Sequence, residues 1–471
     1  MLAARRSLFL AAMLFAAFHA HADSSSPSEV GDASGADPSA AASPYEKPRY
    51  LLALAEVEGN NVAVNAFDRL VLPGDWAQTD LKTAWANVQG PWGFDEDPFP
   101  VNEIGHPIQG SQYFIAGRSN GLDFWESGAG TAFGAVMWKL FGEVDDAMIN
   151  DVVTTTLGGM ALGEMLHRLY IEAESQDSFA RFFASPLDAA NDALFGKDWD
   201  ESTQGRVSLS LQAGVVAPYL DLDPSRGVVP GFGEITGELG DTIIYGDPFG
   251  GRSAPFDYFE QRFTLAISPS FYGLSFFSDG TLYSFPLVDD GRTELSLAPC
   301  LHYDYVYSSL IELSANAVGL SLIGERREAN GFLLKGEAHV NALALGTDEN
   351  EDFREFEGAQ GINEEGRDYD FCFGAETKIY LEATQPRLGT LSLEFTGYNF
   401  QPIPGVYVSS SPPSPLDYAI VGIFNFSYER IVASHVGVGV AYLLYFKDAL
   451  YDSLPRVGES IDTVTFYGRL F

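Results

Sequence analysis

Basic side chains are scarce in this sequence of 471 residues, which has 27 Lys and Arg against 65 Asp and Glu and a formal net charge of −38. Nucleic acids and anionic lipid surfaces are bound through basic patches, so the charge argues against either as the main partner. Long apolar runs are also missing. Beyond residue 22 no window holds about 18 apolar residues free of charge, which excludes a helical membrane protein.

Cysteine and the common catalytic motifs are rare or absent. Only Cys300 and Cys372 occur, and the sequence leaves open whether they form a disulfide. The G-x-S-x-G elbow of serine hydrolases does not occur. His106 has no partner in an H-x-x-x-H pattern and His167 is isolated, so we predict no metal site and no cofactor.

One acidic stretch invites a calcium interpretation and fails it. An EF-hand loop that starts at Asp348 needs glycine where Phe353 stands and glutamate where Ala359 stands. We therefore expect a solvated acidic loop over 346–370.

The first residues form an export signal. Arg5 and Arg6 precede a short apolar stretch, and Ala20-His21-Ala22 is an A-x-A cleavage site. We predict a cleaved signal peptide over 1–22, because about 11 apolar residues are too few to span a membrane. No cysteine near the cleavage point could carry a lipid. Residues 23–46, rich in Ser, Ala, Pro and Asp, are expected to form a disordered leader.

Apolar and polar residues alternate with a period of two through the second half of the sequence, as in half-buried strands or a transmembrane barrel. In one run Leu334 and Val340 share a face, and Lys335 and His339 share the other. Runs of this kind total about 12 and lie at 206–216, 258–268, 271–278, 281–288, 294–307, 309–324, 333–344, 371–382, 388–400, 417–430, 433–446 and 461–471.

These runs favour a mainly β protein with an antiparallel transmembrane β-barrel over 201–471, because closure leaves no unpaired strand edge in lipid. Aromatic residues make up 13% of the sequence, which suits interfacial girdles. The last residue is Phe471, as is common in outer-membrane barrels, although Arg469 shares its face. A water-soluble periplasmic sandwich is the alternative. On the barrel interpretation Cys300 and Cys372 point into the lumen.

Three stretches in the first half carry a family resemblance. They read NEIGHPIQGSQYFIAGRSNGLDFWES from Asn102, WKLFGE from Trp138 and NDVVTTTLGGMALGEMLHR from Asn150. Over roughly residues 50–200 the sequence resembles a bacterial envelope family catalogued as domain of unknown function 3943. Lys139 stands where that family usually has an acidic residue. The motif residues are Asn102, His106, Pro107, Gly110, Tyr113, Arg118, Trp138, Glu143, Asp151, Gly159, Gly163, Glu164 and Arg168.

Helices are predicted over 131–142 and 145–172, where Ala, Leu, Met and Glu are frequent. Gly159 and Gly163 lie four residues apart, which lets another backbone approach closely. We assign 47–200 to a helical module that plugs or caps the barrel. Within it, Glu164 and Arg168 form an ion pair at helical spacing.

Several motif side chains could carry out chemistry. The catalytic candidates are His106, Ser127, Glu143, Asp151 and Glu164. One interpretation is a Ser-His-acid hydrolase and another is a ligand site. We favour a third, in which these residues are held by hydrogen bonds inside a packed module.

We therefore predict a bacterial outer-membrane β-barrel protein of unknown biochemical activity, in contact with outer-membrane lipids and with an envelope or transport role. The sequence leaves open whether it is an enzyme, and we lean against it. The alternative is a barrel-borne lipid hydrolase or acyltransferase, which requires His106 and a Ser or acidic side chain to converge in a cleft open to lipid. The sequence does not identify a substrate, the state of the pore or an oligomer.

Overall fold

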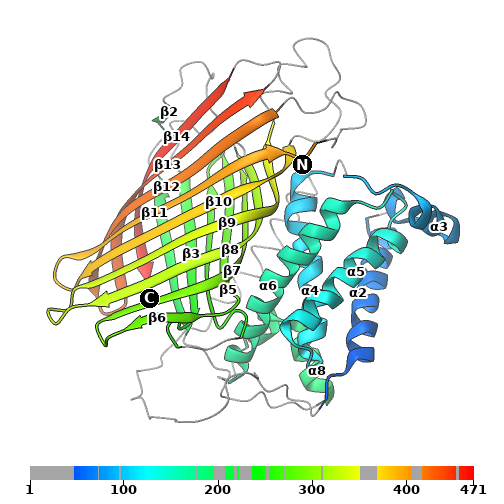
Figure 1. Cartoon of the computed structure of the whole chain (residues 1–471), viewed down its shortest axis with the longest axis horizontal. Helices are drawn as coiled ribbons and strands as arrows, with labels where there is room; N and C mark the ends of the chain where they lie inside the picture. The colour runs from blue at the N-terminus through cyan, green and yellow to red at the C-terminus, as the bar shows by residue number, and fades with distance from the viewer. Residues whose placement is uncertain are drawn as a thin grey trace. The chain divides into compact units, whose positions relative to one another are not determined.

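The computed structural model describes residues 47–72, 74–94, 97–175, 179–195, 207–216, 220–221, 236–250, 254–269, 271–308, 311–350, 369–404, 416–451 and 456–471. The chain divides into a helical unit and a barrel unit (Figure 1). The helical unit comprises the chain before residue 94, residues 100–205 and residues 252–256, and the barrel unit comprises the remainder, including 94–99. The predicted signal peptide and leader lie outside the described residues.

The helical unit contains two long central helices, α5 and α6, that include the two predicted ones, although α6 begins at Ile149 and not at 145. Capping boxes begin α3, at Asp80, and α5, at Asp123. Among the described helices, none is long and apolar enough to cross a membrane. The elements are α2 (Tyr50–Leu70), η1 (Asp75–Ala77), α3 (Leu81–Gln89), the π-helical turn η2 (Val101–Gly105), α4 (His106–Ser119), α5 (Phe124–Phe141), α6 (Ile149–Ser175), α7 (Arg181–Ala184) and α8 (Pro186–Phe195).

Glycines allow α4 and α6 to pack closely. A Cβ atom on Gly159 would lie 2.5 Å from the carbonyl carbon of Gly110, and one on Gly110 would lie 1.9 Å from the backbone oxygen of Thr155. A Cβ atom on Gly163 would lie 2.8 Å from Cβ of Phe114. The close backbone approach predicted for Gly159 and Gly163 is confirmed, with α4 as the partner.

The barrel unit is a closed antiparallel ring of twelve described strands, as predicted. Neighbours in the ring follow one another along the chain, and β1 pairs with β14 to close it. Outside the ring, β2 pairs with β14 and β6 with β7. The strands are β1 (Val207–Val216), β2 (Leu220–Asp221), β3 (Thr236–Gly246), β4 (Tyr258–Ile267), β5 (Tyr272–Thr281), β6 (Phe285–Asp289), β7 (Thr293–Ser308), β8 (Glu312–Arg327), β9 (Leu333–Glu349), β10 (Tyr369–Gln385), β11 (Gly389–Pro402), β12 (Leu416–Ala433), β13 (Val436–Tyr451) and β14 (Val457–Leu470).

One member of the predicted strand set is wrong. The run at 281–288 supplies only part of β6, a short exposed strand interrupted by Pro286 that pairs outside the ring. Its place is taken by β3, which the alternation missed. The β3 sequence TGELGDTIIYG is rich in glycine, and glycine weakens a strand pattern because it offers no side chain to either face.

The outer face of the barrel is apolar, and polar side chains line much of its inner face. On β9, Val340 is 68% exposed, whereas its neighbours His339 and Asn341 are 5% and 3% exposed. On β8, Leu320 is 52% exposed and Ser321 only 1%. A water-soluble sandwich buries its apolar faces against each other. The closed ring and the reversed burial therefore exclude the sandwich.

Aromatic side chains cover part of the outer face of β7. Phe99 stacks on Tyr305 and Tyr307, with ring centroids 5.4 Å and 6.0 Å apart. Tyr369 packs edge-on against Phe99, and its hydroxyl donates a 2.8 Å hydrogen bond to the backbone oxygen of Asp97. The segment 94–99 is thereby part of the barrel unit.

The prediction of a solvated loop over 346–370 is wrong at both ends of that range. Residues 351–368 lie outside the described residues. β9 continues to Glu349, and β10 begins at Tyr369. Asp348 is 1% exposed, and its carboxylate lies 3.1 Å from Nζ of Lys447 on β13. These acidic side chains are buried because they meet a cation from another wall of the barrel.

Candidate functional site

Charged motif residues gather in a buried group of the helical unit, the helical charge cluster, formed by His106, Lys139, Glu143 and Asp151. Nζ of Lys139 bridges the carboxylates of Glu143 and Asp151. Nε2 of His106 lies 3.4 Å from Oδ1 of Asp151. Nε1 of Trp138 donates a 2.7 Å hydrogen bond to Oε1 of Glu143. The structure thus brings together three of the predicted candidates, from the start of α4, the end of α5 and the first turn of α6.

Opposite charges compensate one another in this cluster. Burial lowers the pKa of Lys139, but Asp151 and Glu143 outweigh that effect and hold the pKa well above its ordinary value. Burial raises the pKa of Glu143, but the charges of Lys139 and His106 leave the pKa below its ordinary value. Lys139 is therefore the cation that makes the carboxylates of Glu143 and Asp151 tolerable in this largely buried group.

Glu164 lies at the centre of a second buried group. Its two carboxylate oxygens lie 2.7 Å from Nε of Arg118 and 2.8 Å from Nε of Arg168. Arg168 also donates a 2.6 Å hydrogen bond to the backbone oxygen of Pro255. Burial raises the pKa of Glu164, but the two arginines outweigh it and lower the pKa below its usual range. Glu164 is thus a fixed anion, and its predicted pairing with Arg168 is confirmed.

Ser127 belongs to neither group. A Cβ atom on Gly117 would lie 2.5 Å from Oγ of Ser127, so the serine side chain is packed against the backbone of α4. This Oγ atom is buried and makes no hydrogen bond to any described residue. A serine nucleophile needs a base within hydrogen-bond reach. The Ser-His-acid arrangement is therefore not formed.

Other motif residues build the helical core. Pro107 occupies the first turn of α4, where its missing N–H leaves no helical bond unmade. The hydroxyl of Tyr113 donates to Oδ1 of Asn61 on α2 and accepts from Gln109. Asn102 is fully buried. These residues hold α2, η2 and α4 in position around the charged groups.

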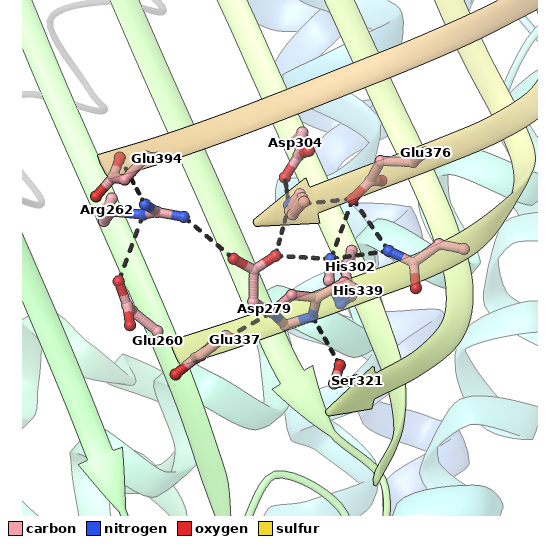
Figure 2. A network of polar contacts seen from close by, with 12 residues as sticks. Glu260, Arg262, Asp279, His302, Asp304, Ser321, Glu337, His339, Glu376 and Glu394 are labelled. Atoms are coloured by element: carbon pink, nitrogen blue, oxygen red, sulfur yellow. Dashed lines mark hydrogen bonds and ion pairs between the residues drawn. The ribbon is translucent and has the colours of Figure 1, made fainter. Parts of the chain in front are cut away.

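A larger polar group, the lumen network, lies inside the barrel (Figure 2). Nζ of Lys378 contacts Asp279 and lies 2.7 Å from Oδ1 of Asp304. Nη1 of Arg262 lies 2.9 Å from Oε2 of Glu394. The network consists of Glu260 and Arg262 of β4, Asp279 of β5, His302 and Asp304 of β7, Glu337 and His339 of β9, Glu376 and Lys378 of β10 and Glu394 of β11.

The pair formed by Arg262 and Glu394 crosses the whole lumen. In the ring, β4 and β11 stand opposite each other, with five strands between them in either direction. A round barrel of twelve strands would be roughly 24 Å across, given the usual strand spacing and tilt. Extended Arg and Glu side chains together do not reach that far. The barrel must therefore be flattened here, with opposite walls joined by ion pairs.

Flattening does not join the two cysteines. Cys300 on β7 and Cys372 on β10 are both buried, and neither is in a disulfide. Two strands of the ring, β8 and β9, lie between the strands that carry the two cysteines. Cys372 packs in an apolar cluster of the barrel interior, whereas Cys300 lies beside the lumen network.

An apolar cavity of about 170 Å³ lies in the barrel unit beside the apolar cluster. Phe277 and Val306 line one wall, and Ile423 and Tyr445 line the other, from strands on the opposite side of the ring. A dry apolar cavity of about this volume holds a benzene-sized molecule.

The helical unit resembles a known family. Residues 91–190 match the model of the DUF3943 family, a domain of unknown function. The match confirms the resemblance over a shorter range than 50–200. The DUF3943 segment contains the helical charge cluster and the group around Glu164. No curated protein matches the sequence.

Several solved barrel structures are similar to this chain. The outer membrane protein Omp33 of Acinetobacter baumannii is 10% identical, with 57% of this chain and 99% of that chain covered and a TM-score of 0.22. The NanC porin is 11% identical, with 56% and 99% covered and a TM-score of 0.28. OmpT of Vibrio cholerae in its trimer form is 10% identical, with 57% and 99% covered and a TM-score of 0.24. The closed ring of strand pairs, not these similarities, establishes the barrel beside the DUF3943 segment.

Proposed function

We propose that this protein is an outer-membrane β-barrel of the bacterial envelope, surrounded by lipid, with a transport role and a lumen that is gated rather than permanently open. The reversed burial supports the membrane setting, because lipid solvates exposed apolar side chains such as Val340 and Leu320 at no cost. The ion pair between Arg262 and Glu394 is the observation that carries the gate.

The ion pair between Arg262 and Glu394 is weak enough to separate and form again, as a gate requires. The side chains of Arg262 and Glu394 are 22% and 28% exposed, so neither is fully removed from solvent. Partly solvated ion pairs contribute only about 1 kcal/mol, because water replaces the partner when the pair separates. The pair can therefore open and close at ambient temperature.

Location is tested by fractionation and gel mobility. We expect the protein in the outer-membrane fraction, with a shift in mobility on boiling, because a closed barrel resists detergent until heated. Recovery from the soluble periplasmic fraction would contradict the membrane setting.

Gating is tested by conductance across a planar lipid bilayer. We expect the parent protein to be closed most of the time and the Arg262→Ala, Glu394→Ala double variant to open more often, because the other contacts between opposite walls remain. A matched control is the Arg326→Ala, Glu328→Ala double variant, which removes an ion pair exposed outside the lumen, with side chains 58% and 35% exposed. This control should behave like the parent. A steadily open parent, or a double variant that stays closed, would contradict the gate.

A further inference from the structure

One group of side chains beside the lumen network has the composition of a transition-metal site. The thiol of Cys300 and one imidazole nitrogen each of His302 and His339 all lie within 4.8 Å of one another, and all three residues are buried. From these residues we infer that the barrel wall binds one thiophilic transition-metal ion, with Zn²⁺ as the ion that fits. This inference does not depend on whether the barrel conducts.

The strand register brings the three ligands together across β8. Cys300 and His302 are two residues apart on β7 and share its inner face, whereas His339 lies on β9. Between them, β8 places Gly319 opposite both Cys300 and Asn341. A Cβ atom on Gly319 would lie 2.1 Å from Oδ1 of Asn341, so only glycine leaves room for side chains of β7 and β9 to meet there. Sγ of Cys300 indeed donates a 3.3 Å hydrogen bond to Oδ1 of Asn341.

The ligand atoms need only small movements to bind an ion. Zinc binds sulfur at about 2.3 Å and nitrogen at about 2.0 Å in a tetrahedron, which places neighbouring ligands roughly 3.5 Å apart. Side-chain rotations that shift each atom by about 1 Å close the present spacing. Thiolate and imidazole are ligands that select zinc over magnesium or calcium. Three protein ligands leave a fourth position for water or a solute.

A carboxylate already orients His302 as metal-bound histidines are oriented. Nδ1 of His302 lies 2.7 Å from Oδ1 of Asp279 and 3.2 Å from Oε1 of Glu376. This leaves Nε2, which is buried and makes no hydrogen bond to any described residue. Metal-bound histidines almost always donate their other ring N–H to a carboxylate or carbonyl oxygen, which fixes the tautomer and makes the ligand nitrogen more basic. His302 is thus fully buried and held by carboxylates through Nδ1.

His339 differs from His302 in that both of its ring nitrogens have partners, as Figure 2 shows, and one of these contacts must be given up when the ion binds. Its Nδ1 lies 2.7 Å from Oγ of Ser321, and its Nε2 lies 3.3 Å from Oε2 of Glu337. The rings of His302 and His339 are 5.0 Å apart, centroid to centroid. Carboxylates outnumber lysine and arginine in the surrounding lumen network, which favours an added cation. Sequence spacing could not reveal this site, because His339 is distant along the chain and joins only through the register of β8.

The test is metal binding by the purified full-length barrel in detergent, with Zn²⁺ and Co²⁺ as probes. After treatment with a chelator, the parent should take up one Zn²⁺ per chain, and Co²⁺ should give the near-ultraviolet charge-transfer absorption of a cobalt thiolate. Cys300→Ser should abolish that absorption, and Cys300→Ser and His302→Gln should each weaken binding at least 10-fold. Asp279→Asn, which neutralises the carboxylate that orients His302 and also contacts Lys378, should weaken it about 10- to 100-fold.

The other cysteine provides the control. Cys372→Ser removes a buried thiol outside the site and should bind Zn²⁺ like the parent. If Cys300→Ser fails to assemble, alkylation of the parent serves instead: Zn²⁺ should slow the modification of Cys300 and leave that of Cys372 unchanged. A parent that binds no Zn²⁺, a Cys300→Ser variant that binds it as tightly as the parent, or equal protection of both thiols would overturn the site.

Discussion

The helical charge cluster and the lumen network both bury ionic side chains, but they differ in balance. In the cluster, Lys139 and His106 face Glu143 and Asp151, and all but the slightly exposed Glu143 are buried. In the network, carboxylates outnumber cations, and its members come from strands on opposite sides of a lumen. A balanced, enclosed group favours one rigid arrangement. An unbalanced group that spans a partly solvated interior is suited to opening and to binding a cation.

Removing the cation of the enclosed cluster should have the largest effect. Lys139→Met keeps the side-chain length but removes the cation that Glu143 and Asp151 share, and His106 and Trp138 remain as their weaker partners. This loss should cost about 3 to 5 kcal/mol of unfolding free energy. Denaturant unfolding followed by the helical circular-dichroism signal measures this loss. Adding Glu143→Gln and Asp151→Asn to Lys139→Met should restore most of the stability. A loss well under 1 kcal/mol for Lys139→Met alone would show that the cluster is hydrated.

His106 distinguishes a structural cluster from a catalytic one. His106→Asn leaves Asp151 with one partner fewer and should lower stability by about 1 to 3 kcal/mol, with no change in cellular lipids. Thermal unfolding and lipid profiling of cells measure the two effects. A His106→Asn variant that melts like the parent while the lipid profile changes would favour the lipid-modifying enzyme.

Where burial and a neighbouring acidic group dominate, a carboxyl group should contribute to folding stability with a pH dependence opposite to that of Glu143. Burial and the neighbouring Asp192 raise the pKa of Glu174 on α6 to about 8. The folded state therefore holds this proton more tightly than the unfolded state, whose pKa is about 4.3. Stability from this group is fully present below about pH 4.3 and is lost as the pH rises toward 8.

Glu174→Gln should then melt like the parent in acid and above the parent at alkaline pH. Melting temperatures measured on both sides of this window test the effect, which is small because Glu174 is partly exposed. Glu143→Gln offers the contrast, because a lowered pKa gives stability that is present above about pH 4.3 and lost in acid. If the melting temperatures of the two variants changed with pH in the same way, the opposite pKa shifts of Glu174 and Glu143 would be contradicted.

The sequence predicts the barrel strands well, the helical charge cluster in part and the lumen network not at all. Alternation depends only on neighbouring residues, so it predicted the barrel and the polar inner face, and it failed only at glycine-rich β3 and around Pro286. Family motifs predicted His106, Glu143 and Asp151 as candidate site residues, and only the structure adds Lys139 to their cluster. The lumen network escaped prediction because Arg262 and Glu394 meet through closure and flattening of the ring, and no local spacing encodes that contact.

The central claim is that the polar faces of the strands turn into the barrel and the apolar faces meet lipid. It is tested most directly by labelling with a thiol reagent confined to the hydrocarbon of the bilayer. In a Val340→Cys variant, we expect rapid labelling at position 340, whose parent side chain is 68% exposed, and none at the buried native Cys300 and Cys372. Labelling of the native thiols from within the bilayer, with position 340 reached only by a water-soluble reagent, would contradict it.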